Sequence, residues 1–260
     1  MPKYVIVPVA SVGCGKSTVG KTLASVCGFG QVQNDDITGT NRRPKFLQAI
    51  LEQLESHQVV YADRNNSSVK ERKELVDGLR KELGNEVDMV GLQFVHNQQT
   101  IPALKKITQE RVFARKDHQT VSTATLAPQK IYMIMGGFIK RLEPFTDAEK
   151  KEYKLIVDLP VEKDNTADNV LRLLEKIKDN SATAPMLEDT KYTDQEVRDT
   201  VQNLIVSETK SEEVLQKEKE EREKNRKRKP ADKSKGPRKK QPKLTFNKGA
   251  KKDLDKSSGA

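Results

Sequence analysis

The sequence predicts an α/β fold with a mostly parallel sheet flanked by helices, a helical lid and a disordered basic C-terminal tail. Short apolar runs alternate with longer amphipathic segments, which is typical of parallel sheets whose strands are joined by crossover helices. Residues 224–260 hold 15 Lys and Arg against three Asp, and they include a single aromatic residue. Such a composition buries too little apolar surface to offset the entropy lost on ordering, so we expect this tail to be disordered.

The elements are predicted from the spacing of the apolar residues. Four short apolar runs are expected to be strands, namely Tyr4–Val9, Val59–Ala62, Val90–Val95 and Leu155–Leu159, and one more strand is expected to end near Gln33. Amphipathic spacing predicts helices over Ser17–Val26, after Pro44 (Phe46, Ile50, Leu51 and Leu54 on one face), over Val69–Leu83 and over Val170–Ile177. A capping-box pattern from Thr193 to Glu196 predicts the start of a last amphipathic helix.

Charge divides the chain into three parts. Residues 224–260 carry a net charge of +12 and the whole chain carries +10, so residues 1–223 carry −2. The apolar pattern ends near Val206, which predicts a folded domain over residues 1–206. Residues 207–223 are mainly Glu, Lys and Arg, and this composition is typical of a charged linker that is either a solvated helix or disordered.

Composition also argues against several classes of protein. Two cysteines, Cys14 and Cys27, are too few for a disulfide framework, which favours a reducing compartment, nuclear or cytoplasmic. No apolar run approaches the roughly 18 residues of a membrane span, so we expect no membrane partner. The three histidines lie far apart, and no zinc-site spacing is visible.

The segment Ala10–Thr18, with the sequence ASVGCGKST, carries the most specific motif. It follows a predicted strand and precedes a predicted helix, which is the context of a phosphate-binding loop and predicts a P-loop kinase. In such a loop, backbone N–H groups hold the phosphates of a nucleoside triphosphate, the Lys reaches the β and γ oxygens, and the Ser ligates Mg²⁺. The expected nucleotide-binding residues are Gly13, Cys14, Gly15, Lys16, Ser17 and Thr18, although Ala10 stands where the motif has Gly.

Acidic residues follow two of the predicted strands. Asp35 and Asp36 lie where the second strand should end, and either could accept a proton from an attacking hydroxyl. An Asx-turn or a helix cap is an equally good interpretation of this pair. Asp63 directly follows Val59–Ala62 and is a candidate Mg²⁺ ligand, with a helix cap before Val69 as the alternative.

Arg111 and Arg115 are four residues apart and therefore share one helix face. Two guanidinium groups on a lid helix could clamp the β and γ phosphates and stabilise charge in the transition state. Solvated helix charges are the alternative interpretation. Residues 116–120 follow as a predicted loop, in which His118 is expected to form loop hydrogen bonds rather than to act as a catalyst.

Together these motifs resemble the polynucleotide 5′-kinase domain of fungal tRNA ligases and, more distantly, phage polynucleotide kinase. The resemblance covers Lys3 to Lys178 and rests on Val7-Pro8-Val9-Ala10, Gly13 to Ser17, Gln33-Asn34-Asp35, Ala62 to Asn66, and Arg111 to Arg115 followed by His118-Gln119. It implies that Lys16 and Ser17 hold phosphate and metal, that Asp35 is the general base on the 5′-hydroxyl, and that Arg111 and Arg115 form the lid. It also implies that Asp63, Arg64 and Asn65 line the acceptor side, and that GTP is the favoured donor, with ATP as the other candidate.

The chain also departs from these families. Phage enzymes have an Arg three residues after the base, whereas this chain has Thr38, so Arg42 or Arg43 would have to bind the acceptor phosphate. The lid Gly-Asp-Asn of the fungal enzymes is replaced here by Lys116-Asp117 followed by His118. The chain has neither the Lys-x-Asp-Gly motif of nucleotidyl transferases nor the His-x-Thr motifs of the cyclic phosphodiesterase. We therefore expect a stand-alone kinase or one piece of a split system, without sealing activity.

The expected partner is RNA, with tRNA exon ends as the first candidate. The two basic clusters, residues 224–229 and 238–243, could bind nucleic acid through phosphates or bind an import receptor, and a solubilising tail is the alternative. Two other functions stay open from the sequence. One is a P-loop kinase of a small metabolite, and the other is a non-catalytic scaffold that binds nucleotide and RNA.

Overall fold

The computed structural model describes residues 2–95, 101–116 and 121–228 of the chain. The chain forms two compact units, Met1–Leu215 and Gln216–Ala260, and the sheet lies in the first unit. The tail predicted over residues 224–260 falls almost entirely outside the described residues, as do Asp117 and His118. The predicted domain boundaries at residues 206 and 223 therefore stay predictions.

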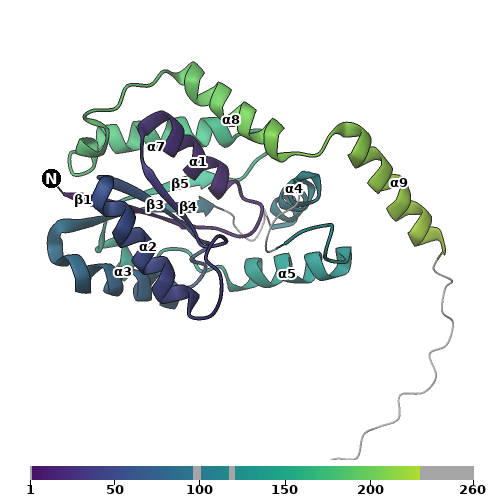
Figure 1. Cartoon of the computed structure of the whole chain (residues 1–260), viewed down its shortest axis with the longest axis horizontal. Coiled ribbons are helices and arrows are strands. Elements are labelled where there is room, and N and C mark those ends of the chain that lie inside the picture. Colours follow the sequence, from purple (N-terminus) through teal and green to yellow (C-terminus); the bar gives the residue numbers. More distant parts are fainter. Residues whose placement is uncertain (1, 96–100, 117–120, 229–260) are drawn as a thin grey trace, which may run out of the picture. The chain divides into compact units, whose positions relative to one another are not determined.

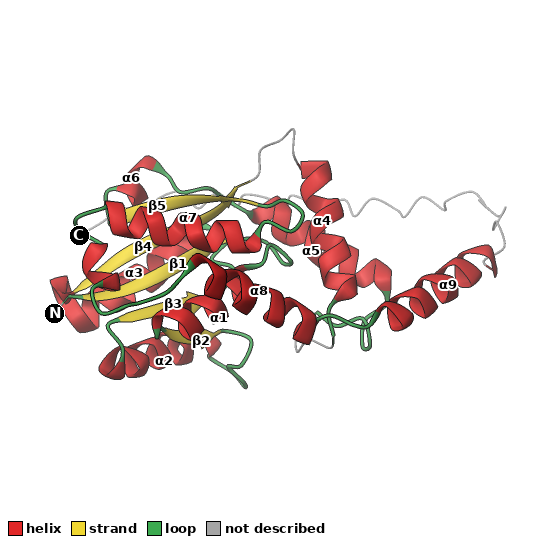
Figure 2. Cartoon of the chain, turned by 90° about the horizontal axis from the view of Figure 1, so that it is seen from above, coloured by secondary structure: helices red, strands yellow, loops and turns green. Residues whose placement is uncertain are grey.

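A five-stranded parallel sheet forms the centre of the first unit, as predicted (Figure 2). Its strands are β1 (Lys3–Val9), β2 (Gly30–Gln33), β3 (Val59–Asp63), β4 (Val87–Val95) and β5 (Tyr153–Pro160). They lie in the order β2-β3-β1-β4-β5, and every neighbouring pair is parallel. Since all strands point the same way, the loops after β1, β2 and β3 meet at one edge of the sheet.

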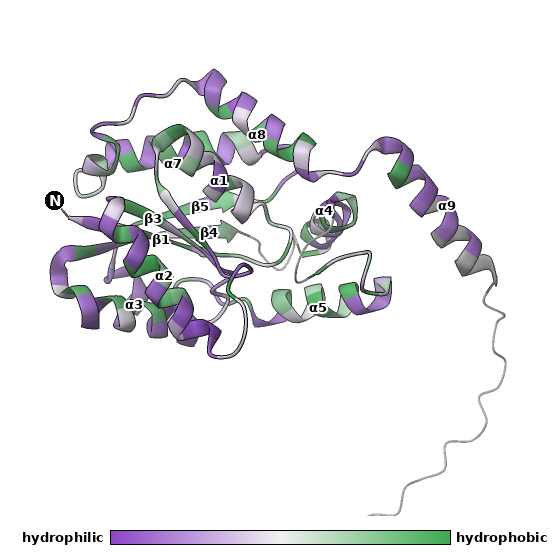
Figure 3. Ribbon diagram, viewed as in Figure 1, coloured by the Kyte–Doolittle hydropathy of each residue, from purple (hydrophilic) through white to green (hydrophobic). Residues whose placement is uncertain are grey.

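Helices cover both faces of the sheet (Figure 1). Helices α1 (Lys16–Cys27), α7 (Thr166–Asp179) and α8 (Asp194–Glu208) pack on one face, and α2 (Arg42–Ser56) and α3 (Val69–Leu83) pack on the other. The alternation along β1 divides the core, because Tyr4 and Ile6 pack with α1, whereas Val5 and Val7 pack with α2 and α3. Figure 3 shows the hydrophobic colour along these central strands.

Helices α4 (Ile101–Ala114) and α5 (Pro128–Arg141) lie beyond the carboxyl ends of the strands (Figure 2). The sequence indicated only the end of α4 and did not predict α5, whose buried Ile131 and Met135 pack against Val112 and Phe113.

The remaining helices are η1 (Gly84–Glu86), α6 (Asp147–Lys150), η2 (Ala184–Leu187) and α9 (Glu212–Arg228). The predicted capping box at Thr193 is confirmed. The sequence left a solvated helix or disorder open for the charged linker, and most of that linker lies in the helix α9. No helix in the described part of the chain is long and apolar enough to span a membrane.

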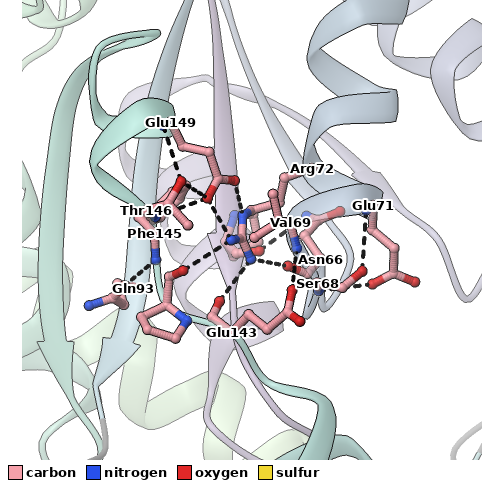
Figure 4. A network of polar contacts seen from close by, with 12 residues as sticks. Asn66, Ser68, Val69, Glu71, Arg72, Gln93, Glu143, Phe145, Thr146 and Glu149 are labelled. Atoms are coloured by element: carbon pink, nitrogen blue, oxygen red, sulfur yellow. Dashed lines mark hydrogen bonds and ion pairs between the residues drawn. The ribbon is translucent and has the colours of Figure 1, made fainter.

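A buried arginine ties the segment after β3 to the turn before β5 (Figure 4). The side chain of Arg72 in α3 is fully buried, and all five of its N–H groups find acceptors. Two donate to the Glu149 carboxylate at 2.6 and 2.9 Å, and the others donate to the backbone carbonyls of Asn66, Glu143 and Pro144 at 2.9–3.1 Å. The guanidinium also lies 5.0 Å from the ring centre of Phe145.

Arg72 thereby fixes the segment that follows Asp63. Asn66 is fully buried and has a positive φ of 44°, a conformation that residues of ordinary helices and strands do not adopt. Its carbonyl is held by Arg72, and its side-chain amide donates to the Pro8 carbonyl at 3.1 Å. A non-glycine residue in this conformation persists only where its surroundings hold it there, which is the role of these bonds.

We expect Arg72→Met to lower the free energy of unfolding by about 3–5 kcal/mol, because it leaves the buried Glu149 carboxylate without its cation. Urea unfolding measures the loss. Lys73→Met is the matched control, since Lys73 lies next along α3 but pairs with Asp77 at an exposed position. Equal stability of the two variants would contradict a structural role for the Arg72 network.

Candidate active site

A cleft of about 1020 Å³ opens at the carboxyl ends of the strands. The loops after β1, β2 and β3 line it, together with α4, part of α5, the start of α7 and the end of α8. It contains most of the residues that the sequence singled out, namely Gly13, Gly15, Lys16, Ser17, Thr18, Asp35, Arg42, Asp63, Arg64, Asn65, Arg111 and Arg115. Ligands of open parallel sheets bind at this edge, where the strands end.

The predicted phosphate loop joins β1 to α1. Gly13 and Gly15 have φ values of 85° and 95°, a region that residues with a Cβ rarely adopt. A Cβ on Gly13 would lie 2.7 Å from the Thr108 carbonyl oxygen, so this glycine lets the loop touch α4. Gly15 is the N-cap of α1, and the first N–H groups of that helix therefore point into the cleft as an anion site.

Cys14 lies in this loop but turns its side chain into the protein. The thiol is buried, and its sulfur lies 3.3 Å from Ser11 Oγ. Burial raises the pKa of the Cys14 thiol, against the opposing effects of the Ser11 hydrogen bonds and of Arg111 and Lys16. Cys14 therefore contributes its backbone to the loop, while its side chain stays a neutral thiol.

Lys16 and Asp63 form the central charged contact of the cleft. Lys16 Nζ lies 3.1 Å from Asp63 Oδ1 and 3.3 Å from Ser17 Oγ. The Asp63 side chain is only 2% exposed, and Oδ2 accepts a hydrogen bond from Gln31 at 3.3 Å. Oδ1 has no well-directed hydrogen bond from any described residue. A buried carboxylate oxygen of this kind needs a cation or a bound donor to offset its lost hydration.

The helix-cap interpretation of Asp63 is wrong. Helix α3 is capped by Ser68, whose hydroxyl accepts from the Glu71 N–H in a reciprocal capping box. Asp63 ends β3 instead, beside its neighbour β2, where the Asn34 N–H donates to the Asp63 carbonyl at 3.0 Å. Its carboxylate is thus free of a capping role and faces Lys16.

Asp35 and Asp36 lie in the turn that follows β2, and both line the cleft. The turn is closed by the Asp36 N–H, which donates to the Gln33 carbonyl at 3.1 Å. Arg42 at the start of α2 donates to the Asn34 carbonyl and so anchors the same turn. The turn interpretation and the base interpretation are therefore compatible, because the turn presents both carboxylates to the cleft.

The two predicted lid arginines both reach the cleft. Arg111, in the last turn of α4, donates to the Cys14 carbonyl at 3.4 Å and to the Glu162 carbonyl at 2.6 Å. Arg115 follows α4 directly and donates to the Val121 carbonyl at 2.7 Å, while its buried Nε has no acceptor among the described residues. The solvated-charge alternative does not hold for either residue, because both are partly buried.

Burial lowers the pKa of Arg115, and the negative charges of Asp35 and Glu208 act in the opposite direction. Burial likewise lowers the pKa of Arg111. An arginine titrates so far above neutrality that both side chains keep their charge. The charges of Asp35 in the turn after β2 and of Glu208 at the end of α8 thus both act on the Arg115 guanidinium.

The remaining predicted acceptor residues separate into two groups. Arg64 and Asn65 line the cleft, and Arg64 is held by Glu71 at 3.2 Å. Arg42 lines the cleft too, and its buried Nε lacks an acceptor in the described part of the chain. Arg43 does not line it, because its exposed side chain pairs with Glu74 at 2.6 Å. Of the two arginines that the sequence left open, Arg42 is the one placed beside the turn of Asp35.

Several supporting residues were missed from the sequence. Gln31 holds Asp63, and the Tyr61 hydroxyl donates to the Lys16 carbonyl at 2.8 Å. Tyr61 is two residues before Asp63 in β3, so the two-residue period of a strand was a signal that could have found it. Glu208, at the end of α8, also lines the cleft and lies far from the motifs in sequence, so no local pattern pointed to it.

Ser17 and Asp63 are the two residues suited to hold a divalent cation. Both contact Lys16 Nζ, both offer oxygen, and Asp63 Oδ1 lacks a directed hydrogen bond. Groups of three or more His, Cys, Asp or Glu in metal-binding geometry are absent from the described residues. Mg²⁺ in nucleotide sites takes one or two protein oxygens and completes its shell with phosphate and water, so this donor set fits it.

Comparison with known proteins gives the following similarities. The model of the tRNA ligase kinase domain family matches residues 5–162. The chain is 35% identical over 167 residues to tRNA ligase 1 of Schizosaccharomyces pombe, covering 59% of this chain and 20% of that protein. It is 30% identical over 227 residues to a tRNA ligase of Candida albicans, covering 82% of this chain and 25% of that protein. The chain thus spans a fifth to a quarter of the length of these relatives.

A solved structure described as a fungal RNA kinase shares the fold. It superposes with a TM-score of 0.69 at 27% identity, over 79% of this chain and 97% of that one. The similarity therefore reaches beyond the matched family region of residues 5–162 and includes nearly the whole of the solved chain.

We expect Gly13→Ala to lower the free energy of unfolding by about 1–3 kcal/mol more than Gly28→Ala, because overpacking adds to the strain of a positive φ. Both glycines have positive φ, but a Cβ on Gly28 meets nothing within 4 Å, whereas one on Gly13 meets the Thr108 backbone. Urea denaturation of both variants checks the difference. Equal losses would show that the loop can move away from α4 at no cost.

Proposed function

Because the chain belongs to the tRNA ligase kinase domain family, we propose that it transfers the γ-phosphate of GTP or ATP to the 5′-hydroxyl of RNA. Membership makes the chain a kinase that uses a nucleotide phosphate donor. The observation that carries the finer proposal is the meeting of Lys16, Asp35, Asp63 and Arg115 around one cleft. These side chains supply what in-line phosphoryl transfer needs, namely a phosphate clamp, a base, a metal ligand and a charge stabiliser.

The donor triphosphate binds over the phosphate loop in this proposal. The N–H groups at the start of α1 hold the β-phosphate, and Lys16 turns from Asp63 toward the β and γ oxygens. Ser17 and Asp63 are the residues that would hold Mg²⁺. When bound, the ion offsets phosphate charge and orients the β and γ oxygens. The 3.1 Å contact between Lys16 and Asp63 supports this division, since it already brings the phosphate ligand and the metal ligand together.

Asp35 acts as the general base on the acceptor. It accepts the proton of the 5′-hydroxyl as the 5′ oxygen forms its bond to the γ-phosphorus. The bond from that phosphorus to the bridging oxygen of the β-phosphate breaks, and the nucleoside diphosphate leaves with the electron pair. The place of Asp35 in the cleft that the phosphate loop also lines, and in the field of Arg115, supports this assignment.

Arg111 and Arg115 stabilise the transferring phosphoryl group. Arg111 lies against the phosphate loop through its bond to the Cys14 carbonyl, and Arg115 lines the same cleft, where the charge of Asp35 acts on it. We propose that Arg111 serves the donor end of the reaction and Arg115 the acceptor end. Such a pair can follow negative charge as it spreads over the oxygens of the transferring group.

The acceptor is proposed to lie along Arg42, Arg64 and Asn65. Arg42 Nε and Asn65 Oδ1 are buried and lack hydrogen-bond partners among the described residues, so Arg42 Nε–H can donate to a phosphate oxygen and Asn65 Oδ1 can accept from a sugar hydroxyl. The names of the relatives, tRNA ligases and a fungal RNA kinase, favour RNA over DNA as the acceptor. We propose tRNA exon ends as the natural substrate and the basic tail, residues 224–260, as a further contact to nucleic acid or to an import receptor.

The test is transfer of label from γ-labelled GTP and ATP, with Mg²⁺, to RNA and DNA oligonucleotides that end in a 5′-hydroxyl. We expect label on RNA, and we expect Asp35→Asn to lower kcat by about 10²–10⁴-fold, the usual contribution of a general base. Asp36→Asn is the matched control, because Asp36 lies in the same turn and lines the same cleft. It should retain most of the transfer.

Three outcomes would count against this proposal. Absence of label on any oligonucleotide, from a protein that binds nucleotide, would favour a metabolite kinase or a scaffold. Loss of transfer in Asp36→Asn with none in Asp35→Asn would move the base to Asp36. Label on DNA at the rate seen for RNA would remove the RNA preference.

We expect Arg42→Met to raise the KM for RNA by about tenfold or more, because a charge-assisted bond to phosphate is lost, while kcat for the bound substrate changes less. Arg43→Met removes the same charge from the next residue, whose side chain pairs with Glu74 at the surface. Its KM should stay within about twofold of the unmutated value, since exposed pairs contribute little. A larger effect of Arg43→Met would show that the acceptor follows a path outside the cleft.

A further inference from the structure

The segment Ser207–Lys210, which we call the strap, joins the end of α8 to the end of the lid helix α4. The Lys116 N–H donates to the Glu208 carbonyl at 2.7 Å, and the Lys210 N–H donates to the Ala114 carbonyl at 2.8 Å. These two bonds form an antiparallel bridge between Thr209 and Arg115. The backbone of the proposed lid arginine is thus paired with a segment beyond the matched family region of residues 5–162.

Side chains add to this pairing. Lys116 Nζ donates to the Ser207 carbonyl at 2.7 Å, and Lys210 Nζ donates to Thr123 Oγ1 at 2.7 Å, in the segment that precedes α5. The strap therefore contacts both sides of the lid segment that carries Arg115. Three of these hydrogen bonds reach Ala114 and Lys116 on either side of Arg115, and the fourth reaches Thr123, so they restrict that segment more than one contact would.

Glu208 connects the strap to the helix that starts at the phosphate loop. Lys21 in α1 lies 2.6 Å from Glu208 Oε1, and both side chains are partly exposed at the cleft. This ion pair joins the second turn of α1 to the end of α8, although the two residues are 187 positions apart in sequence. Glu208 also places a negative charge near the Arg115 guanidinium.

We propose that Glu208 is a positioning residue, which holds Arg115 in register with α1 and hence with the phosphates bound at the start of that helix. The backbone of Glu208 fixes the end of the lid, and its carboxylate fixes α8 to Lys21. Because transition-state stabilisation depends on guanidinium placement to within fractions of an ångström, a small displacement of the lid end lowers the rate of transfer. This inference rests on the proposed role of Arg115 in phosphoryl transfer.

The test uses the full chain and compares Glu208→Gln, Lys21→Met, Lys21→Arg, Arg115→Met and the double variant Glu208→Gln with Arg115→Met. Glu208→Gln keeps the backbone bonds and removes the charge. The matched control is Arg198→Met, which breaks the ion pair of α8 with Asp168 of α7, two residues that do not line the cleft. For each variant, kcat and the donor KM are measured on RNA with a 5′-hydroxyl, beside the melting temperature.

We expect kcat to fall by about 5- to 20-fold in Glu208→Gln and Lys21→Met, with the donor KM within about twofold, because phosphate binding does not depend on Arg115 alone. Lys21→Arg keeps the positive charge that pairs with Glu208, so its kcat should stay near that of the unmutated chain. The double variant should be no slower than Arg115→Met, since Glu208 acts through Arg115. Arg198→Met should match the unmutated chain in kcat.

Hydrogen exchange of residues 111–116 gives a reading that does not need the acceptor. Exchange in Glu208→Gln should be about fivefold faster there than in the unmutated chain or in Arg198→Met. Unchanged exchange, full kcat in Glu208→Gln beside a slow Arg115→Met, or additive losses in the double variant would each overturn the inference. Absence of transfer to RNA by the unmutated chain, with faster exchange in Glu208→Gln, would overturn the proposed function and leave the positioning by Glu208 standing.

Discussion

The chemistry of the cleft depends on the contact between Lys16 and the buried carboxylate of Asp63 at 3.1 Å. It exists because β1 and β3 are neighbours in a parallel sheet, so the loop after one and the last residue of the other meet at the same edge. Tyr61 fixes the Lys16 backbone, and Gln31 fixes one oxygen of Asp63. A cation and an anion are thereby held together in a position that a phosphate and a metal ion can share.

Arg72 and Glu149, which hold the segment after Asp63 in place, do not line the cleft. Arg72 gives all five N–H groups to Glu149 and to three carbonyls, and one of these belongs to Asn66 in the segment after Asp63. Arg72 therefore fixes the segment that includes Arg64 and Asn65, the two proposed acceptor residues. On the other side, the strap holds the end of α4. The proposed acceptor residues and the proposed lid are held by two separate sets of hydrogen bonds. A substitution can therefore alter one set and leave the other intact.

Local signals predicted the parts of the fold that depend on local sequence. The strands, the phosphate loop and the capping box at Thr193 follow from apolar spacing, from the glycine-rich motif after the first strand and from Thr followed three residues later by Glu. Spacing could not separate Arg42 from Arg43, because adjacent residues differ only in what their side chains meet after folding. Glu208 was missed for a related reason, because its importance lies in contacts with segments far away in sequence. Helix α5 was missed although its buried residues Ile131, Met135 and Ile139 recur every four residues after Pro128, a pattern that could have predicted it.

The buried thiol of Cys14 has a consequence for the chemical durability of the protein. A cysteine within a phosphate loop would ordinarily be exposed to the positive field of a helix start and of nearby cations, which favours the thiolate and hence oxidation and alkylation. Here the side chain is turned inward against Ser11, and burial raises its pKa. The Cys14 side chain thus packs as a small apolar residue would. Because its raised pKa leaves little thiolate, electrophiles and peroxide have little to attack.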